Sequence, residues 1–252
     1  MTIEPIPAFN DNYFWLINQG QQAIVVDPGE ANVVLSRLEN QGLTLHAIFV
    51  THKHYDHIGG VEQLKAETGC QVISPPIEGL SMDHVVHDNE TISAFGEAFH
   101  VIAVPGHTLE HVAYFSESLK ACFVGDTLFS SGCGRMFEGT PEQFLTSLKR
   151  LVELPDDTKI YCAHEYTLAN LDFALTVEPK NSAISLKLAK MKALRTENKP
   201  TLPTTIGDEK ITNPFLRTKE ADIVEAVTAH TGRTLSDEVA VFHALRSWKD
   251  NF

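Results

Sequence analysis

The stretch Thr51-His52-Lys53-His54-Tyr55-Asp56-His57-Ile58-Gly59-Gly60 places three histidines and one aspartate within six consecutive positions. An apolar run over residues 47–50 comes directly before the cluster and predicts a buried strand, and residues 61–68 after it have helical spacing. The polar cluster is therefore expected on the loop that leaves a strand end, where open α/β sheets place their ligands. Neutral imidazoles and carboxylates at such a position are good ligands for Zn²⁺ and similar divalent metals. A solvated polar loop is the alternative, but packing does not explain four such residues so close together.

The overall composition is that of a folded, acidic protein. The chain has 252 residues, of which 43% are hydrophobic and 21% are charged, enough for one large domain or two unequal ones with a sizeable core. Its formal net charge of −13 argues against general binding to nucleic acid or to an anionic membrane surface. We therefore expect no nucleic-acid partner and no membrane association. An anionic small-molecule substrate would need a local patch of positive charge.

The cysteine pattern and the first residues indicate a reducing compartment. Four widely separated cysteines form no CxxC pair, which is typical of reduced thiols rather than of a disulfide framework. They are Cys70, Cys122, Cys133 and Cys162. No lysine or arginine precedes Arg37, so the basic start of a signal peptide is not expected, and no apolar run approaches the length of a membrane span. We expect a cytoplasmic monomer.

Three further side chains of metal-ligand type each follow a predicted strand. The strands are expected over residues 101–104, 121–124 and 159–162, and the side chains are His107, Asp126 and His164. Asp27 also closes a strand, the third of a β-meander over residues 1–27; support of a metal ligand and a plain turn are equally open roles for it. Three more histidines lack neighbouring ligands and are expected to be structural or surface residues, namely His84, His87 and His100.

Together the strand ends carry seven ligand-type side chains. They are His52, His54, Asp56, His57, His107, Asp126 and His164. One tetrahedral zinc needs about four protein ligands, or three and a water when it is catalytic. Seven ligands suit two metals with one bridging group, and Asp126 is the obvious bridge because a carboxylate offers two oxygens. His52 and His54 alternate along an extended backbone, so a turn of the loop must bring both to one metal.

The last third of the chain has a different character. Helical patterns are expected over residues 168–177, 183–196, 219–230 and 237–249, and strand signals disappear. A proline-rich connection over residues 199–218 crosses the middle of this part. Ahead of this last third of the chain, Thr140-Pro141-Glu142-Gln143 has the form of a capping box and predicts a helix to about residue 153. We predict two domains, a metal-binding catalytic domain at residues 1–165 and a helical substrate-binding domain at residues 166–252.

The pattern THxHxDH at residues 51–57, followed by a distant His, Asp and His, resembles the metallo-β-lactamase superfamily over most of residues 20–165. That resemblance implies an α/β fold of the α+β kind, a four-layer αββα sandwich, here with a C-terminal helical domain. It implies one metal on His52, His54 and His107, a second on Asp56, His57 and His164, and Asp126 bridging the two. Two divalent ions are expected, zinc above all, although such ligands also accept iron or manganese.

Over nearly its whole length the chain is similar to a narrower family, the hydroxyacylglutathione hydrolases (glyoxalase II). The motifs that carry this resemblance are Gly125-Asp126-Thr127-Leu128-Phe129 with Gly132-Cys133-Gly134-Arg135, Cys162-Ala163-His164-Glu165-Tyr166-Thr167, and Leu245-Arg246-Ser247-Trp248-Lys249. The family implies glutathione contacts at Arg135, Phe137, Tyr166, Arg246 and Lys249. Some members have lysine in place of Arg135 and tyrosine in place of Phe137, so we expect a different contact geometry at the first and a missing hydroxyl at the second.

The resemblance implies an enzyme, a metal-dependent thioester hydrolase of the hydroxyacylglutathione hydrolase type. Its expected substrate is an S-(2-hydroxyacyl)glutathione, S-D-lactoylglutathione above all. The products would be glutathione and a 2-hydroxy acid such as D-lactate, in the second step of methylglyoxal detoxification. A hydroxide between the metals would attack the thioester carbonyl, Asp56 would orient that hydroxide, and Asp126 would fix the metal separation. Arg246 and Lys249, three apart on one helix face, would hold the glutathione carboxylate.

Other functions on the same fold are a β-lactamase, a nuclease and a one-iron sulfur dioxygenase. The full set of seven ligands argues against the mononuclear dioxygenase, the helical tail with paired cations against the lactamase, and the acidic balance against the nuclease. A non-catalytic metal-binding protein is a further alternative. Cys133, between two glycines, is not expected to be a nucleophile, because no histidine partner is near it in the sequence and bound metals supply a better nucleophile.

Overall fold

The computed structural model describes all residues, 1–252, and they form two compact units. The first unit comprises Met1–Ala103 and Glu110–Gly125, and the second comprises Val104–Leu109 and Asp126–Phe252. The predicted division into domains at residues 1–165 and 166–252 stays a prediction. None of the helices combines the length and the apolar character needed to cross a lipid bilayer.

Six strands form the main sheet of the first unit, in the order β1-β2-β3-β4-β5-β6. They are β1 (Thr2–Ala8), β2 (Asn12–Gln19), β3 (Gln22–Val26), β4 (Thr44–Phe49), β5 (Gln71–Ser74) and β6 (His84–Val85). The first three make the predicted antiparallel meander, and β3 to β6 run parallel. Parallel neighbours need crossover segments. The helices of this unit supply two of them, namely α1 (Ala31–Gln41) and the pair α2 (Tyr55–Ile58) and α3 (Val61–Thr68).

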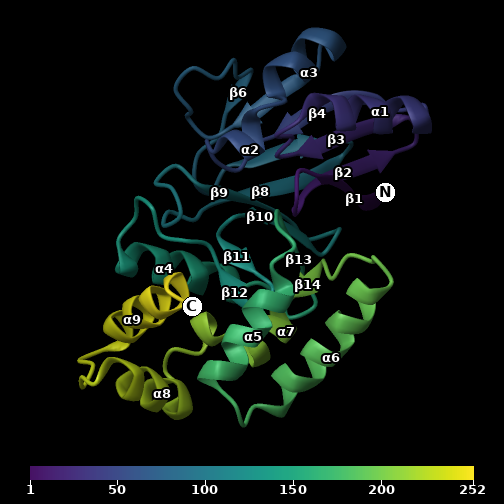
Figure 1. The fold of residues 1–252 in the computed structure, drawn as a ribbon. Helices are drawn as coiled ribbons and strands as arrows, with labels where there is room; N and C mark the ends of the chain where they lie inside the picture. The colour runs from purple at the N-terminus through teal and green to yellow at the C-terminus, as the bar shows by residue number, and fades with distance from the viewer. The chain divides into compact units, whose positions relative to one another are not determined.

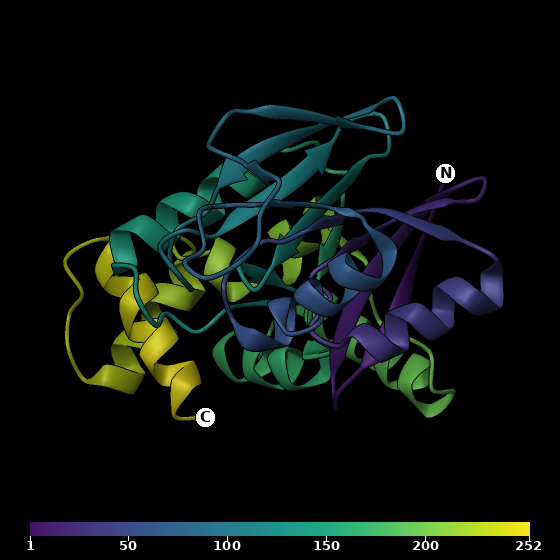
Figure 2. The same ribbon diagram turned by 90° about the horizontal axis from the view of Figure 1, so that it is seen from above.

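The second half of strand β4, residues 47–49, leads into the histidine-rich stretch and is buried on both faces, whereas Thr44 and His46 are exposed. Helices α1 and α3 lie over one face of the sheet (Figures 1 and 2), and Ile48 belongs to the apolar cluster beneath them. Phe49 points the other way, and its ring centroid lies 5.2 Å from that of Phe99 and 5.0 Å from that of Tyr114. A strand that is covered on both sides has no polar face, which explains the continuous apolar run in its sequence.

Four antiparallel strands of a second sheet also belong to the first unit, in the order β10-β9-β8-β7. They are β7 (Thr91–Ala94), β8 (Glu97–Ala103), β9 (Val112–Ser116) and β10 (Ala121–Gly125). The Tyr114 hydroxyl of β9 donates a hydrogen bond to the carbonyl oxygen of Val50 at 2.7 Å. This bond ties the second sheet to the residue that directly precedes the histidine-rich stretch.

The second unit contains two short strand pairs and most of the helices. The strands are β11 (Leu128–Phe129) with β12 (Gly132–Cys133), and β13 (Lys159–Cys162) with β14 (Thr204–Thr205). The helices are α4 (Pro141–Val152), α5 (Thr167–Val177), α6 (Ser182–Thr196), α7 (Ile206–Thr212), α8 (Ala221–Thr231) and α9 (Glu238–Asp250), with a 3-10 turn at Pro214–Leu216. The predicted capping box of α4 is confirmed, because Thr140 and Gln143 exchange backbone-to-side-chain hydrogen bonds.

A row of phenylalanines packs the helices of the second unit together. The ring centroid of Phe242 on α9 lies 5.8 Å from that of Phe144 on α4 and 6.1 Å from that of Phe215. Phe215 in turn lies 6.1 Å from Phe173 on α5. All four rings are fully buried, and Phe242 joins α9 directly to α4 and to the 3-10 turn. Helix α8 runs beside α9 (yellow in Figures 1 and 2).

The predicted proline-rich connection is wrong in one respect, because residues 199–218 contain β14, α7 and the 3-10 turn. The expectation that strands end before residue 166 is wrong for the same reason. These elements are two to seven residues long, too short to show a period in the sequence, and Ile206 and Phe215 become fully buried only through tertiary packing. The other predicted helices of this part are confirmed to within about two residues at their ends.

Candidate active site

Asp27 anchors the loop that carries the first four predicted ligands. It is 3% exposed, and its Oδ1 accepts a hydrogen bond from the Thr51 backbone N–H at 2.7 Å. Its Oδ2 accepts from the Thr51 hydroxyl at 2.7 Å and lies 3.1 Å from His57 Nδ1. Its φ of 54° lies in the left-handed region, which aspartate tolerates better than most residues. Of the two roles that the sequence left open for Asp27, the contacts favour support of a ligand histidine.

This network determines which ring nitrogen of two histidines can bind a metal. His57 Nδ1–H donates to Asp27, so His57 Nε2 carries the lone pair. The Thr51 hydroxyl gives its proton to Asp27, so its oxygen accepts from His52 Nδ1–H at 3.0 Å, and His52 Nε2 also carries a lone pair. Both imidazoles are buried. A ligand histidine held through its other nitrogen is a common feature of protein metal sites.

The four ligand candidates of the first unit approach one another in pairs. His52 Nε2 lies 3.1 Å from His54 Nδ1, and His57 Nε2 lies 3.5 Å from Asp56 Oδ2. With metal–ligand bonds of about 2.0–2.1 Å, two ligands of one tetrahedral ion lie roughly 3.3 Å apart. Asn12 Nδ2 donates to Asp56 Oδ2 at 2.9 Å and orients that carboxylate. The two pairs have the separations that two cations require.

The other three ligand candidates lie in the second unit, where Asp126 stands between two histidines. Asp126 Oδ2 lies 3.4 Å from His107 Nε2, and Asp126 Oδ1 lies 3.3 Å from His164 Nε2. All three side chains are buried. Each oxygen and its histidine again have the separation of two ligands on one ion. This is the geometry that a bridging carboxylate requires.

The backbone and one aromatic ring fix the two histidines of the second unit. His107 Nδ1 lies 2.7 Å from the carbonyl oxygen of Arg135, to which it donates, so its Nε2 carries the lone pair. The His164 ring stacks on Tyr166 with centroids 4.7 Å apart and planes at 5°. Gly134 lets the chain pass close to the bridging aspartate candidate, since a Cβ there would meet the carbonyl oxygen of that aspartate at 1.9 Å.

Buried polar side chains from the helices hold the β11–β12 hairpin, which follows the bridging aspartate candidate. Glu209 is fully buried, and one of its carboxylate oxygens accepts from the Ser131 N–H at 2.6 Å while the other receives the Lys187 ammonium at 2.6 Å. Asn213 donates its amide hydrogens to Glu209 at 2.9 Å and to the Gly132 carbonyl at 2.8 Å. The left-handed Ser131, with φ 57°, is thus supported at its backbone N–H.

The two arginines among the predicted substrate residues share one carboxylate. Asp250 Oδ1 lies 3.4 Å from Arg135 Nε and 3.0 Å from Arg246 Nη2. Arg246 is only 6% exposed and also donates to the carbonyl oxygen of Cys133 at 2.8 Å. Arg246 therefore holds the hairpin, while the half-exposed Arg135 is the more accessible cation of the two.

The remaining predicted substrate residues lie at the surface of the second unit. The Lys249 ammonium stands over two rings, 5.3 Å from the centroid of Phe173 and 5.4 Å from that of Phe252. Burial lowers the pKa of Lys249, and the neighbouring positive charge of α9 acts in the same direction. Phe137 is 58% exposed, and Tyr166 is 37% exposed. These side chains are accessible to a ligand.

The Cys133 thiol is not suited to nucleophilic catalysis. It is buried, and burial raises the pKa of Cys133 to about 11, although Arg246 Nη1, 3.6 Å from the sulfur, acts in the opposite direction. The thiolate is the reactive form, and it is scarce at neutral pH under these conditions. This agrees with the expectation from the sequence.

Several residues that shape the site were not found from the sequence. They are Asn12, His111, Glu209 and Asp250. His111 is fully buried and stacks on the His52 ring, with centroids 4.5 Å apart and planes at 12°. In the sequence, the one indication that His111 belongs to the site is its position four residues after His107. Three other histidines were expected to be structural or surface residues, and His84, His87 and His100 are indeed exposed.

The fold and these histidine and aspartate groups define a class, the divalent-metal-binding proteins of the metallo-β-lactamase superfamily. The superfamily model matches residues 9–164. The model for the hydroxyacylglutathione hydrolase C-terminus matches residues 165–252. The chain belongs to the hydroxyacylglutathione hydrolase family of this superfamily, which confirms the predicted fold class and family.

Curated relatives match the whole length of the chain. The hydroxyacylglutathione hydrolase of Aliivibrio salmonicida is 49% identical over 100% of both chains. Those of Albidiferax ferrireducens and Ectopseudomonas mendocina are each 48% identical, over 100% and 99% of both chains respectively.

Solved structures share the fold. The ETHE1 protein of Myxococcus xanthus is 25% identical with a TM-score of 0.66, over 99% of this chain and 98% of that one. TTHA1623, in a di-iron-bound form, is 25% identical with a TM-score of 0.62, over 84% of this chain and 100% of that one. The B3 metallo-β-lactamase BLEG-1 is 23% identical with a TM-score of 0.64, over 85% and 99%, and shows the fold alone.

The role of Asp27 can be tested with Asp27→Asn. This change keeps the side-chain size and the tolerance for a left-handed backbone, but it removes the charged acceptor that orients His57. We expect metal affinity to fall about 10–100-fold, as for other outer partners of ligand histidines, measured by competition with a chromophoric chelator. The exposed Asp222→Asn is the matched control and should bind metal like the wild type. Overlapping titrations of Asp27→Asn and wild type would contradict this role.

The Glu209 network can be tested by chemical denaturation. Glu209→Gln leaves the Lys187 ammonium buried without its counter-charge, so the free energy of unfolding should fall by about 3–5 kcal/mol. Adding Lys187→Met should recover part of that loss. Asp156→Asn, which breaks the surface pair with Lys210 at 2.5 Å, should cost less than about 1 kcal/mol. Equal losses in Glu209→Gln and Asp156→Asn would rule out a special contribution of the buried pair.

Proposed function

We propose that the protein is a metal-dependent thioester hydrolase that cleaves S-(2-hydroxyacyl)glutathione, S-D-lactoylglutathione above all, to glutathione and a 2-hydroxy acid such as D-lactate. Relatives 48–49% identical over 99–100% of the chain, all named hydroxyacylglutathione hydrolase, support this reaction. Belonging to that family makes a lactamase, a nuclease, a sulfur dioxygenase or a non-catalytic metal-binding protein less suitable alternatives.

One observation carries the proposal, namely the pairing of ligand atoms within each unit. The first unit offers two pairs of ligand atoms, and the second offers Asp126 with one histidine at each oxygen. Two half-sites in each unit suit two cations with Asp126 as the bridge. We infer that the first cation takes His52, His54 and His107, and that the second takes Asp56, His57 and His164. Zinc suits this donor set, and iron or manganese is also acceptable.

Two divalent cations, when bound, supply a water nucleophile that ionises near neutral pH and a Lewis acid for the thioester carbonyl oxygen. The protein residues position the reaction. Asp56, held by the Asn12 amide at 2.9 Å, can accept a proton from the attacking water and orient it. The leaving thiol needs little help from a protein acid, since its pKa is about 8.5.

The substrate's glutathione part would bind on the helical side of the second unit. Arg135 and Lys249 are the accessible cations for its carboxylates, while Tyr166 and the exposed Phe137 ring offer apolar contact. Arg246 contributes mainly by holding Asp250 and the hairpin in place. Residues 1–165 would thus hold the metals and residues 166–252 the substrate, a division supported by the two family models meeting between residues 164 and 165.

The reaction is tested by loading the protein with zinc and following hydrolysis of S-D-lactoylglutathione at the thioester absorbance. Asp126→Asn removes one bridging oxygen, so turnover should fall more than about 100-fold and metal content, measured by elemental analysis, should drop. Asp222→Asn is the control for both readings. Oxygen consumption with glutathione persulfide, or β-lactam cleavage, in place of thioester hydrolysis would favour one of the alternatives. Full activity of Asp126→Asn would exclude the bridge.

The substrate role of Lys249 is tested with Lys249→Met, which keeps the apolar stem against Phe173 and removes the charge. KM should rise about tenfold with little change in kcat, because a carboxylate contact made equally in ground state and transition state contributes to uniform binding. Lys190→Met, an exposed change on α6, is the matched control. An unchanged KM in Lys249→Met would exclude this contact.

A further inference from the structure

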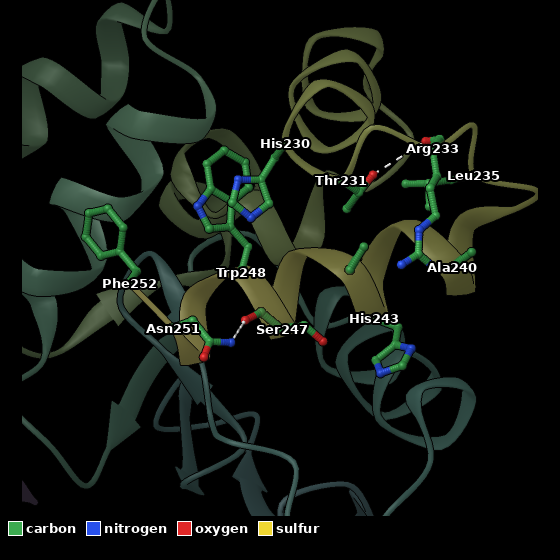
Figure 3. Close-up of a pocket in the computed structure, with 11 residues that line it drawn as sticks. His230, Thr231, Arg233, Leu235, Ala240, His243, Ser247, Trp248, Asn251 and Phe252 are labelled. Carbon is green, nitrogen blue, oxygen red and sulfur yellow. Dashed lines mark hydrogen bonds between the residues drawn. The ribbon is translucent and has the colours of Figure 1, made fainter.

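A pocket lies against the C-terminal helices α8 and α9. It has a volume of ≈ 650 Å³ and is formed by the end of α8, the loop that follows it and one side of α9 (Figure 3). Helix α9 contributes His243, Ser247 and Asn251, which are spaced four residues apart and therefore share a face. The volume falls within the range of small-molecule sites.

One end of the pocket is a flat aromatic platform. The rings of His230 and Trp248 stack with centroids 3.9 Å apart and planes at 7° (Figure 3). The indole is fixed from another side by Phe173, whose ring meets it edge-on at 5.6 Å. His230 is exposed, so a further planar ring can be added to this stack.

Two nitrogen-bearing side chains at the other end of the pocket have no protein partner. Arg233 and His243 line the pocket (Figure 3), and neither the guanidinium nor the imidazole has a hydrogen bond or an ion pair. The acidic side chains of the same loop and helix are engaged elsewhere. Asp237 accepts from the Ala240 backbone N–H, while Glu238 and Asp250 pair with a lysine of α4 and an arginine of α9. In a chain of net charge −13, this leaves a local excess of positive charge.

We propose that this pocket binds a small molecule in which a planar aromatic ring is joined to an anionic group such as a phosphate. The ring stacks on the His230–Trp248 platform, and the anion meets the Arg233 guanidinium, whose fork of N–H donors matches phosphate and carboxylate oxygens. His243 and Trp248 are five residues apart on α9, roughly 7.5 Å along the helix axis. A nucleoside monophosphate can span that separation.

The polar side chains of this site differ from those proposed for the thioester chemistry, although Phe252, which lines the pocket, has its ring centroid 5.4 Å from the Lys249 ammonium. Arg246 on α9 faces inward, since it is buried and bonded to the Cys133 carbonyl, while His243 and Ser247 face the pocket. Arg233 and His243 are not among the residues proposed to bind metal or glutathione. The pocket can therefore be tested whether or not the proposed hydrolysis is correct.

The experiment is isothermal titration of the metal-loaded full-length protein with AMP as the probe, and with adenosine and inorganic phosphate as its two halves. AMP should bind at least about tenfold more tightly than either half. Arg233→Ala with His243→Ala should weaken AMP binding at least about tenfold, equivalent to about 1.4 kcal/mol, and leave adenosine binding unchanged. His230→Ala should weaken AMP and adenosine alike. Lys190→Ala removes an exposed charge from α6 and is the matched control.

The controls separate this pocket from the proposed active site. Each pocket variant should keep the wild-type melting temperature and the wild-type kcat and KM for the thioester. The proposal is overturned if AMP does not bind at millimolar concentration, or if it binds no better than its halves. AMP affinity that survives in the double variant, or competition between AMP and S-D-lactoylglutathione, would overturn it as well, because the ligand would then sit elsewhere.

Discussion

The buried Asp27 carboxylate needs hydrogen-bond donors, and this need fixes the conformation of the loop at residues 51–57, which carries the first four ligand candidates. Asp27 is out of contact with water, and an unpaired charge there would be costly. The parallel pairing of β3 with β4 places it beside Thr51, whose N–H and hydroxyl it accepts, and the turn into α2 adds His57. The Thr51 hydroxyl and His57 Nδ1–H both donate to Asp27, and the Thr51 oxygen then accepts from His52 Nδ1–H. These bonds therefore also set the tautomers of His52 and His57. The loop thus has its metal-binding nitrogens defined by protein contacts alone.

In the second unit, contacts from the helices, rather than one buried carboxylate, hold the segment that orients a ligand candidate. Its ligand candidates follow strands. The segment between Asp126 and Arg135 contains only the β11–β12 hairpin, in which each strand is two residues long. Glu209 and Asn213 on the helical side, together with Arg246 from α9, bond to its backbone. The Arg135 carbonyl at the end of that segment orients the His107 ring. The helices therefore help to orient the ligand candidate His107 in addition to their proposed role in substrate binding.

The ligand candidates can be recognised in the sequence, whereas the residues that support them cannot. Histidines and aspartates at strand ends are visible as a pattern, because strand ends and ligand chemistry are both local properties. The bond from Glu209 to Ser131 joins positions 78 residues apart, and α7, which carries Glu209, is too short to show a period. Asp27 was recognised at a strand end, but the sequence cannot distinguish an aspartate that caps a turn from one that orients a histidine. Tautomers and bridging geometry depend on contacts across the fold, and no local pattern encodes them.

The placement of Lys249 bears on how an acidic protein can hold an anionic ligand. Its ammonium lies over two phenylalanine rings, and burial is the chief reason that its pKa is lowered. Part of its hydration is therefore already lost in the folded protein, so less must be removed when a carboxylate arrives. A fully hydrated lysine on the same surface would lose more water on binding and would feel the net charge of −13 equally. The cation best suited to an anionic ligand here is thus one that folding has partly desolvated and left without a paired carboxylate.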